Sequence, residues 1–209
     1  MITLEENSTV LFIGDSITDC GRSREDFSNP GCGYVRALAG MLGAEYAELK
    51  PSFINTGISG DRVRDLRARW NKDCLDHSPD IVSIMIGVND TWRRYDAAKD
   101  PTDAEAYRKD YEFILSELKN NLECQIVVVE PFLLPFPADR KEWRVDLDPK
   151  IAVARDLAYQ YADAFVPLDG IFASASIRRE PAYWAPDGVH PSIAGHMLIA
   201  ESWLEHTGL

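Results

Sequence analysis

The chain has 209 residues, of which 45% are hydrophobic and 27% are charged, and this composition is ordinary for one globular domain. It excludes a disordered chain, a collagen-like chain and a coiled coil. Acidic residues outnumber basic ones by 34 to 22, and the formal net charge of -12 disfavours nucleic acid and anionic membranes as partners. We expect residues 1–209 to form a single domain.

Short apolar runs alternate along the chain with longer amphipathic segments. The apolar runs predict strands at residues 9–13, 53–55, 80–86, 125–129 and 164–166. The amphipathic segments predict helices at residues 34–49, 61–77, 102–120, 147–162 and 191–204, and Thr102 with Glu105 has the spacing of a capping box.

The predicted strands are built almost wholly from Val, Ile, Met and Phe, which is typical of strands covered on both faces. Helices between such strands indicate a parallel sheet of about five strands in an α/β/α sandwich. Ligands in folds of this class bind beyond the carboxyl ends of the strands. A ligand site is therefore expected in the loops that follow the strands.

The N-terminus has neither a basic segment nor an apolar one, so we expect no signal peptide. The longest apolar runs are far shorter than the roughly 20 residues that cross a bilayer. The four cysteines contain no CxxC pair, which argues against a zinc knuckle or a disulfide framework. We expect a cytoplasmic protein whose cysteines are small core fillers, with no basic partner near Cys20 or Cys32.

Four loops carry the parts of an acyl-transfer site. Ser16 follows the first strand, Gly57 follows the second, Asn89 follows the third, and Asp187 lies three residues before His190 ahead of the last helix. A serine hydroxyl becomes a nucleophile when an imidazole takes its proton, and a carboxylate can hold that imidazole in the required tautomer. The backbone N–H groups of Ser16 and Gly57 and the side-chain amide of Asn89 are candidate donors to the oxyanion of a tetrahedral intermediate.

These blocks resemble the SGNH (GDSL-type) hydrolases, a family of serine esterases. The resemblance rests on Ser16 in Gly-Asp-Ser-Ile, Gly57 in Asn-Thr-Gly, Asn89 in Gly-Val-Asn-Asp and His190 in Asp-Gly-Val-His-Pro, and it covers residues 11 to about 200. Ile17 stands where the family usually has leucine, which is a conservative departure. The resemblance implies a flavodoxin-like fold, Ser16, Asp187 and His190 as the catalytic residues, and no need for a metal or organic cofactor.

Longer matches, such as residues 12–22 and 190–196, look like the intracellular acetylxylan-esterase-like branch of the family. That likeness implies hydrolysis of acetyl groups from sugars or short xylo-oligosaccharides. We predict that Asp15, Trp92, Arg93 and Trp184 contribute to the substrate site, with Asp15 also holding the serine turn and the tryptophans flanking the nucleophile. Relatives are often oligomeric, so a homo-oligomer is one alternative.

Other functions stay open at this point. A general short-chain acyl esterase, a lipase-like or thioesterase-like member of the family, and a non-catalytic carbohydrate-binding relative would share most of these residues. A nucleotide-binding domain is disfavoured because the loop after the first strand offers Asp15 and Asp19 instead of basic residues. An α/β-hydrolase is disfavoured because Gly-x-Ser-x-Gly is absent.

Residues 61–72 form the one basic stretch. Asp61 with Arg64 and Asp65 with Arg69 have helical ion-pair spacings. We expect a solvated helix face or a subunit contact there in preference to an RNA-binding patch.

Overall fold

The protein is built around one parallel sheet, described in a computed structural model that covers residues 1–97 and 99–209. The strands lie in the order β2-β1-β3-β4-β5, which is the flavodoxin-like order. Their bounds are Thr9–Gly14 for β1, Ser52–Asn55 for β2, Ile81–Met85 for β3, Gln125–Val129 for β4 and Ala164–Val166 for β5. The predicted five-stranded parallel sheet is confirmed.

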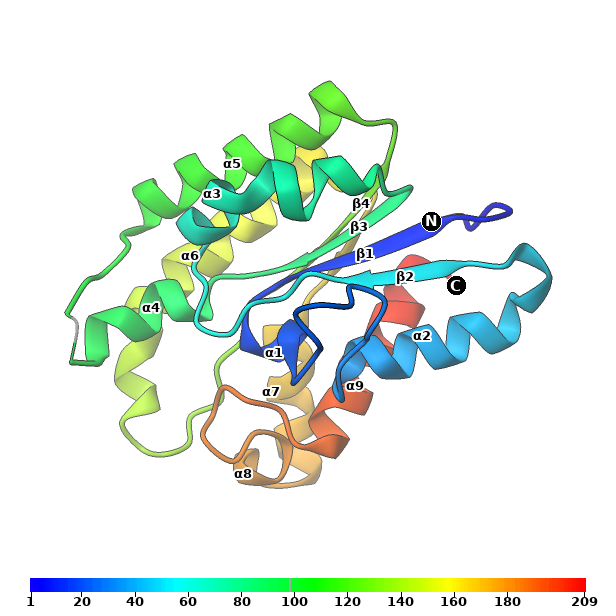
Figure 1. Ribbon diagram of the computed structural model, residues 1–209. Coiled ribbons are helices and arrows are strands. Elements are labelled where there is room, and N and C mark those ends of the chain that lie inside the picture. Colours follow the sequence, from blue (N-terminus) through cyan, green and yellow to red (C-terminus); the bar gives the residue numbers. More distant parts are fainter. Residues whose placement is uncertain (98) are drawn as a thin grey trace.

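Helices cover both faces of the sheet, which explains the apolar strand sequences. On one face lie α3 (Val63–Asp73), α5 (Ala104–Asn121) and α6 (Arg140–Tyr161). On the other face lie α2 (Tyr34–Glu45), α7 (Leu168–Arg178) and α9 (Ile193–Thr207) (Figure 1). The α/β/α sandwich is therefore also confirmed.

Alternate side chains of β1 pack into the core clusters on the two opposite faces of the sheet. Val10 and Phe12 belong to the core cluster on the α2 and α9 side, whereas Leu11 and Ile13 belong to the cluster on the α3 and α5 side. All four side chains are fully buried. This is the period-two pattern of a strand with both faces covered.

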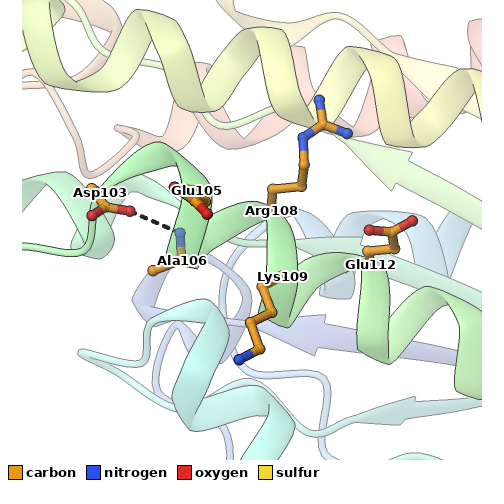
Figure 2. Close-up of a pocket in the computed structure, with 6 residues that line it drawn as sticks. All are labelled: Asp103, Glu105, Ala106, Arg108, Lys109 and Glu112. Atoms are coloured by element: carbon orange, nitrogen blue, oxygen red, sulfur yellow. Dashed lines mark hydrogen bonds between the residues drawn. The ribbon is translucent and has the colours of Figure 1, made fainter.

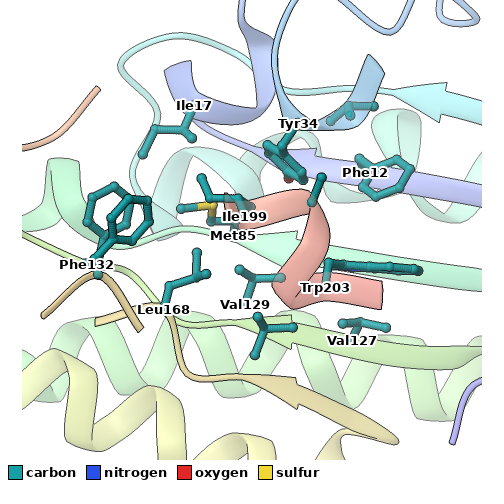
Figure 3. Close-up of a cluster of buried hydrophobic side chains, with 14 of the residues drawn as sticks. Phe12, Ile17, Tyr34, Met85, Val127, Val129, Phe132, Leu168, Ile199 and Trp203 are labelled. Carbon is teal, nitrogen blue, oxygen red and sulfur yellow. The ribbon is translucent and has the colours of Figure 1, made fainter. Parts of the chain in front are cut away.

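Trp203 of α9 anchors the cluster on the α2 side (Figure 3). Its ring centroid lies 6.0 Å from that of Phe12, and the Phe12 ring lies 6.0 Å from that of Tyr34. The indole N–H donates to the buried hydroxyl of Ser83 at 3.0 Å, so the polar end of this large side chain is also satisfied.

Short elements gather at the carboxyl ends of the strands. They are α1 (Ser16–Asp19), α4 (Val88–Tyr95) and α8 (Pro181–Trp184), and α1 sits directly at the end of β1 (Figure 1). No helix was predicted over these three segments or over α7. Two 3-10 turns, η1 (Ala47–Leu49) and η2 (Leu75–His77), end the segments that were predicted as continuous helices over 34–49 and 61–77.

Three local predictions are wrong. Asp103 caps α5 by accepting from the Ala106 N–H at 2.8 Å, so Thr102 does not form the predicted capping box. The helix predicted over 147–162 begins seven residues earlier, at Arg140, and carries Pro149 in its interior.

The predicted ion pairs on 61–72 also change partners. Arg69 binds Asp61 at 2.8 Å and Asp73 at 3.0 Å, and Arg64 pairs with Asp100. Asp61 lies before the first turn of α3, where helical spacing does not apply, and Asp65 pairs with Arg62 instead of Arg69. No helix among residues 1–97 and 99–209 is both long and apolar enough to cross a bilayer.

Candidate active site

The turn that presents Ser16 is fixed by its neighbours. A Cβ on Gly14 would lie 2.2 Å from the Met85 carbonyl oxygen, so the close approach of β1 and β3 requires glycine. Asp15 caps α1 by accepting from the Ile17 N–H at 3.0 Å. Burial raises the pKa of Asp15 to about 7. Asp15 is only 1% exposed, so it holds the serine turn as predicted, but a substrate cannot reach it.

The loop between α8 and α9 brings an imidazole to this turn. The backbone N–H groups of Val189 and His190 both donate to Oδ1 of Asp187, at 3.0 and 2.7 Å. Gly188 has a φ of +84°, and a Cβ there would lie 2.1 Å from the Phe136 carbonyl oxygen, so this turn also requires glycine. The carboxylate and the ring of residues three apart therefore meet within one short turn.

Ser16, His190 and Asp187 form one hydrogen-bonded chain. Oγ of Ser16 lies 2.9 Å from Nε2 of His190, and Nδ1 of His190 lies 2.6 Å from Oδ2 of Asp187. Burial alone would raise the pKa of Asp187, but the hydrogen bonds from His190 and Val189 lower it to about 2. The carboxylate thus accepts from Nδ1–H, which leaves Nε2 free to take the serine proton.

The Asp187 hydrogen bond also acts on the imidazole. It raises the pKa of His190 above its ordinary value, against the opposing effect of burial. A base of this kind is neutral and able to accept a proton at mildly alkaline pH. The arrangement can activate a hydroxyl for attack on an ester carbonyl.

A pocket of about 440 Å³ opens beside this chain of hydrogen bonds. It is lined by Ser16, Ser59, Gly60, Asn89, Trp92, Arg93 and His190. Trp92 flanks the imidazole, with its ring centroid 5.8 Å from that of His190. Two of the sequence-predicted contact residues, Trp92 and Arg93, therefore face the pocket.

Trp184 does not line this pocket. Its indole N–H donates to the carbonyl oxygens of Ala175 and Arg179 at 3.2 and 3.1 Å, and the side chain packs into the core at 9% exposure. The helix α8 turns it away from Ser16 toward α7. The prediction that Trp184 contacts substrate is corrected on this ground.

Gly57 is also placed differently from the prediction. Its N–H donates to Oδ1 of Asn55 at 2.9 Å, and its carbonyl oxygen accepts from Nε of Arg22 at 2.7 Å and from Arg24 at 3.2 Å. An oxyanion would have to compete with Asn55 for that N–H. Gly57 instead fixes the loop, because a Cβ there would lie 2.4 Å from the Asp19 nitrogen.

Gly60 reaches the pocket from the same loop. Its N–H has no acceptor among the residues that the structure describes, and its carbonyl oxygen accepts from Arg93 at 3.2 Å. Oδ2 of Asp19 accepts from both the N–H and the hydroxyl of Ser59, at 2.9 and 2.8 Å, which fixes the peptide before Gly60. Both glycines lie in one six-residue loop, so spacing alone could not separate them.

Asn89 sits in the first turn of α4. The N-cap Gly87 has a φ of +137°, and a Cβ there would lie 2.8 Å from the Tyr107 hydroxyl. One hydrogen of the Asn89 amide donates to the Asp61 carbonyl oxygen at 3.0 Å, and the other remains for a ligand in the pocket. Asp61 is itself held by Arg69.

Arg140 is a site residue that sequence reasoning missed. Nε of Arg140 donates to the Asp187 carbonyl oxygen at 3.1 Å, and the guanidinium lies 4.0 Å from the Trp143 ring centroid and 5.3 Å from that of Trp92. Arg140 of α6 thus holds the loop that carries His190, and we call its contacts with Asp187, Trp143 and Trp92 the Arg140 clamp. The residue precedes the predicted helix, so no pattern in the sequence marked it.

Another hollow, of about 490 Å³, lies along the start of α5 (Figure 2). Its lining comes from that one helix, and Arg108 and Lys109 point away from each other in the view. Its lining contains no hydroxyl beside an imidazole, so it lacks the parts of an acyl-transfer site. Within the described ranges, no group of three or more His, Cys, Asp or Glu residues is placed to hold a metal ion.

A family model for GDSL-like lipases and acylhydrolases matches residues 12–198. The chain belongs to the GDSL-like lipase/acylhydrolase family. Family membership makes it a carboxylic ester hydrolase. This agrees with the resemblance derived from the four sequence blocks.

Its relatives are similar over nearly their whole length. The chain is 40% identical over 206 residues to an acetylxylan esterase of Geobacillus stearothermophilus, covering 95% of this chain and 93% of the relative. The crystal structure of Axe2, an acetylxylan esterase from that organism, aligns with a TM-score of 0.89 at 36% identity, covering all of this chain and 97% of Axe2. A protein from Parabacteroides merdae assigned to the GDSL-like lipases aligns with a TM-score of 0.94 at 40% identity, covering 99% of this chain and 98% of that one.

Proposed function

We propose that this esterase removes acetyl groups from short xylo-oligosaccharides, using Ser16 as nucleophile, His190 as general base and acid, and Asp187 as the residue that orients the imidazole. The observation that carries this proposal is the continuous hydrogen-bonded chain from the Ser16 hydroxyl to the Asp187 carboxylate, open to a small pocket. Three structures of the similar Axe2 are catalytic mutants, in which a serine, an aspartate or a histidine is replaced by alanine. In Axe2 that aspartate and histidine are three residues apart, as Asp187 and His190 are here.

In the acylation step, Nε2 of His190 takes the Ser16 proton while Oγ attacks the acetyl carbonyl carbon. Asp187 stabilises the imidazolium that forms. The imidazolium then gives its proton to the sugar oxygen, and the sugar leaves with the acetyl group bound to Ser16. In the second step, Nε2 of His190 takes a proton from a water molecule, whose oxygen attacks the acetyl carbonyl carbon. The bond to Ser16 Oγ then breaks, the imidazolium returns the proton to Oγ, and acetate is released.

The negative oxygen of each tetrahedral intermediate needs donors. We assign this role to the N–H groups of Ser16 and Gly60 and to the Asn89 amide, with Gly60 in place of the Gly57 predicted from sequence. These donors line the pocket around the nucleophile, and the Gly60 N–H is not used within the described part of the chain. Arg93 and Asp19 hold the Gly60 loop in place.

The substrate class rests on the flanking indole, the net charge and the relatives. The Trp92 ring beside His190 offers an apolar platform for a sugar ring next to the bond that breaks. The net charge of -12 favours a neutral ligand, and an acetylated sugar is neutral. The similar Axe2 is an acetyl-xylooligosaccharide esterase.

Replacing the nucleophile tests the mechanism. We expect Ser16→Ala to lower the turnover of p-nitrophenyl acetate by roughly 10⁴-fold or more, because the attacking oxygen is gone. Ser116→Ala is the matched control, since that hydroxyl bonds only within α5. Full activity of Ser16→Ala would contradict the assignment, and absence of turnover in the unmodified enzyme on every ester would favour the carbohydrate-binding alternative.

A substrate panel tests the acetyl and sugar assignments. We expect faster acetate release from acetylated xylo-oligosaccharides than from other acetylated sugars, with Ser16→Ala as the blank. We also expect rates on p-nitrophenyl esters to fall from acetyl to octanoyl, because most residues that line the pocket are polar and offer a long acyl chain little apolar surface. A rate that climbs with chain length would favour the lipase-like alternative, and equal rates on all acetates would favour a general short-chain esterase.

A further inference from the structure

Two thiols lie in contact beside the nucleophile helix. Cys20 ends α1 and Cys32 lies ahead of α2, and their Sγ atoms are 3.3 Å apart. The Cys32 N–H donates to the Cys20 carbonyl oxygen at 2.8 Å, so the two backbones are already joined at this point. Both cysteines are free, and Cys32 is exposed to solvent.

A histidine side chain lies against this pair. Nε2 of His196 lies 3.5 Å from Sγ of Cys20, and Nδ1 accepts from the Tyr34 N–H at 3.2 Å. Burial lowers the pKa of His196 to about 4, so the ring is neutral and its hydrogen is on Nε2. That hydrogen points at the Cys20 sulfur, where it can stabilise the negative charge that develops as the thiol gives up its proton.

We propose that Cys20 and Cys32 are a thiol oxidation site, which peroxide converts into an intramolecular disulfide. The contact between the sulfurs is the geometric basis, because a disulfide needs the same two atoms at about 2.05 Å. Because the Cys32 side chain is exposed, its rotation can bring its Sγ to bonding distance of Cys20 Sγ while α1 stays in place.

The reaction balances with hydrogen peroxide as the oxidant. The Cys32 thiolate attacks one peroxide oxygen, an S–O bond forms, the O–O bond breaks, and the leaving hydroxide takes up a proton to become water. The Cys20 sulfur then attacks the Cys32 sulfur, the S–S bond forms, and the S–O bond breaks. The departing hydroxide carries off the Cys20 proton as a second water, so two thiols lose two hydrogens and one peroxide yields two waters.

The order of attack follows from the surroundings of the two sulfurs. Burial raises the pKa of Cys20 to about 11, so this thiol stays protonated at neutral pH, whereas Cys32 is open to solvent. Cys32 therefore meets the oxidant first, and Cys20 resolves it with the help of the His196 N–H.

The disulfide would link the two ends of the segment that supports the loop containing Gly60. Residues 20–32 include Arg22 and Arg24, which hold the Gly57 carbonyl oxygen, and this segment is the dark-blue loop between α1 and α2 in Figure 1. Closing a loop of this length covalently restricts the unfolded chain, so oxidation should raise the melting temperature by about 5 °C or more.

The test is mass spectrometry and thermal unfolding of the whole chain after treatment with hydrogen peroxide, followed by dithiothreitol. Trypsin cuts after Arg22 and Arg24, so the expected product is peptide 1–22 linked to peptide 25–36. The linked peptide and the higher melting temperature should both disappear on reduction. Cys32→Ser should show neither, and Cys124→Ser, outside the pair, should show both.

Failure to find the linked peptide would overturn the proposal. So would a melting temperature that does not rise in the oxidised protein, or an equal rise in Cys32→Ser. Because neither readout depends on ester hydrolysis, these outcomes are independent of whether the proposed function is correct.

Discussion

The imidazole of His190 is tuned by the carboxylate of Asp187. The short Nδ1–Oδ2 contact raises the pKa of His190 above its ordinary value, while Asp187 stays ionised down to pH of about 2. A general base works in its neutral form, so the hydrolysis rate should rise with pH as His190 loses its proton. A raised pKa moves that rise toward alkaline pH.

Asp187→Asn should therefore change the pH profile as well as the rate. We expect kcat/KM to fall roughly 10⁴-fold, because an amide cannot hold the required tautomer in the same way. The midpoint of the pH profile should move downward, since the principal cause of the raised His190 pKa is removed. Measuring kcat/KM between pH 5 and 9 checks both, and an unshifted midpoint would contradict the role of Asp187.

Of the three proposed oxyanion donors, the Asn89 amide is the one that belongs to a side chain and can be removed without changing the backbone. Asn89→Ala should lower kcat roughly 10²- to 10³-fold, with a smaller effect on KM, because the hydrogen bond strengthens only as charge develops on the oxygen. Steady-state kinetics on p-nitrophenyl acetate measures the changes in kcat and in KM separately. A change confined to KM would instead make Asn89 a substrate-binding residue.

At the scale of elements, the site depends on a helix that does not supply a reacting group. Arg140 begins α6, stacks on Trp143 and Trp92, and donates to the Asp187 carbonyl oxygen. Its side chain is only 13% exposed. The clamp joins α4, α6 and the loop ahead of α9, three segments that are far apart in the sequence.

Removing this clamp should loosen the loop that carries His190. We expect Arg140→Ala to lower kcat about tenfold and to broaden or shift the pH profile, because a small displacement of the base weakens its contact with Ser16. Arg140→Lys should recover part of the loss, and the exposed neighbour Lys141→Ala is the control. A loss of thermal stability with an unchanged kcat would make the clamp purely structural.

At the scale of the whole molecule, the two core layers hold the sheet that positions the loops. Trp203 is fully buried between Phe12 and the other side chains of its cluster and donates to Ser83. Trp203→Ala should lower the free energy of unfolding by about 3–5 kcal/mol, since it leaves a large cavity and an unpaired hydroxyl. Urea denaturation measures this, and Ile177→Ala, at 88% exposure, should change stability by less than about 0.5 kcal/mol.

The sequence by itself determined the class of fold and the residue types of the site. Strand composition reports burial on both faces, so the five strands were predicted closely, and β4 and β5 match residue for residue. The Asp187 to His190 turn was also predictable, because a three-residue spacing around Gly188 is a local property. The cytoplasmic location and the oligomeric alternative stay predictions.

Tertiary structure alone decided which candidates meet. It placed Gly60 and Trp92 at the pocket, the Gly57 N–H on Asn55 and Trp184 in the core, and it brought Arg140 to Asp187 and His196 to Cys20. These contacts join segments up to 176 residues apart, and they depend on how helices pack over the sheet. No local pattern records such packing, because the periodicity of one element says which face is buried but not what lies against it.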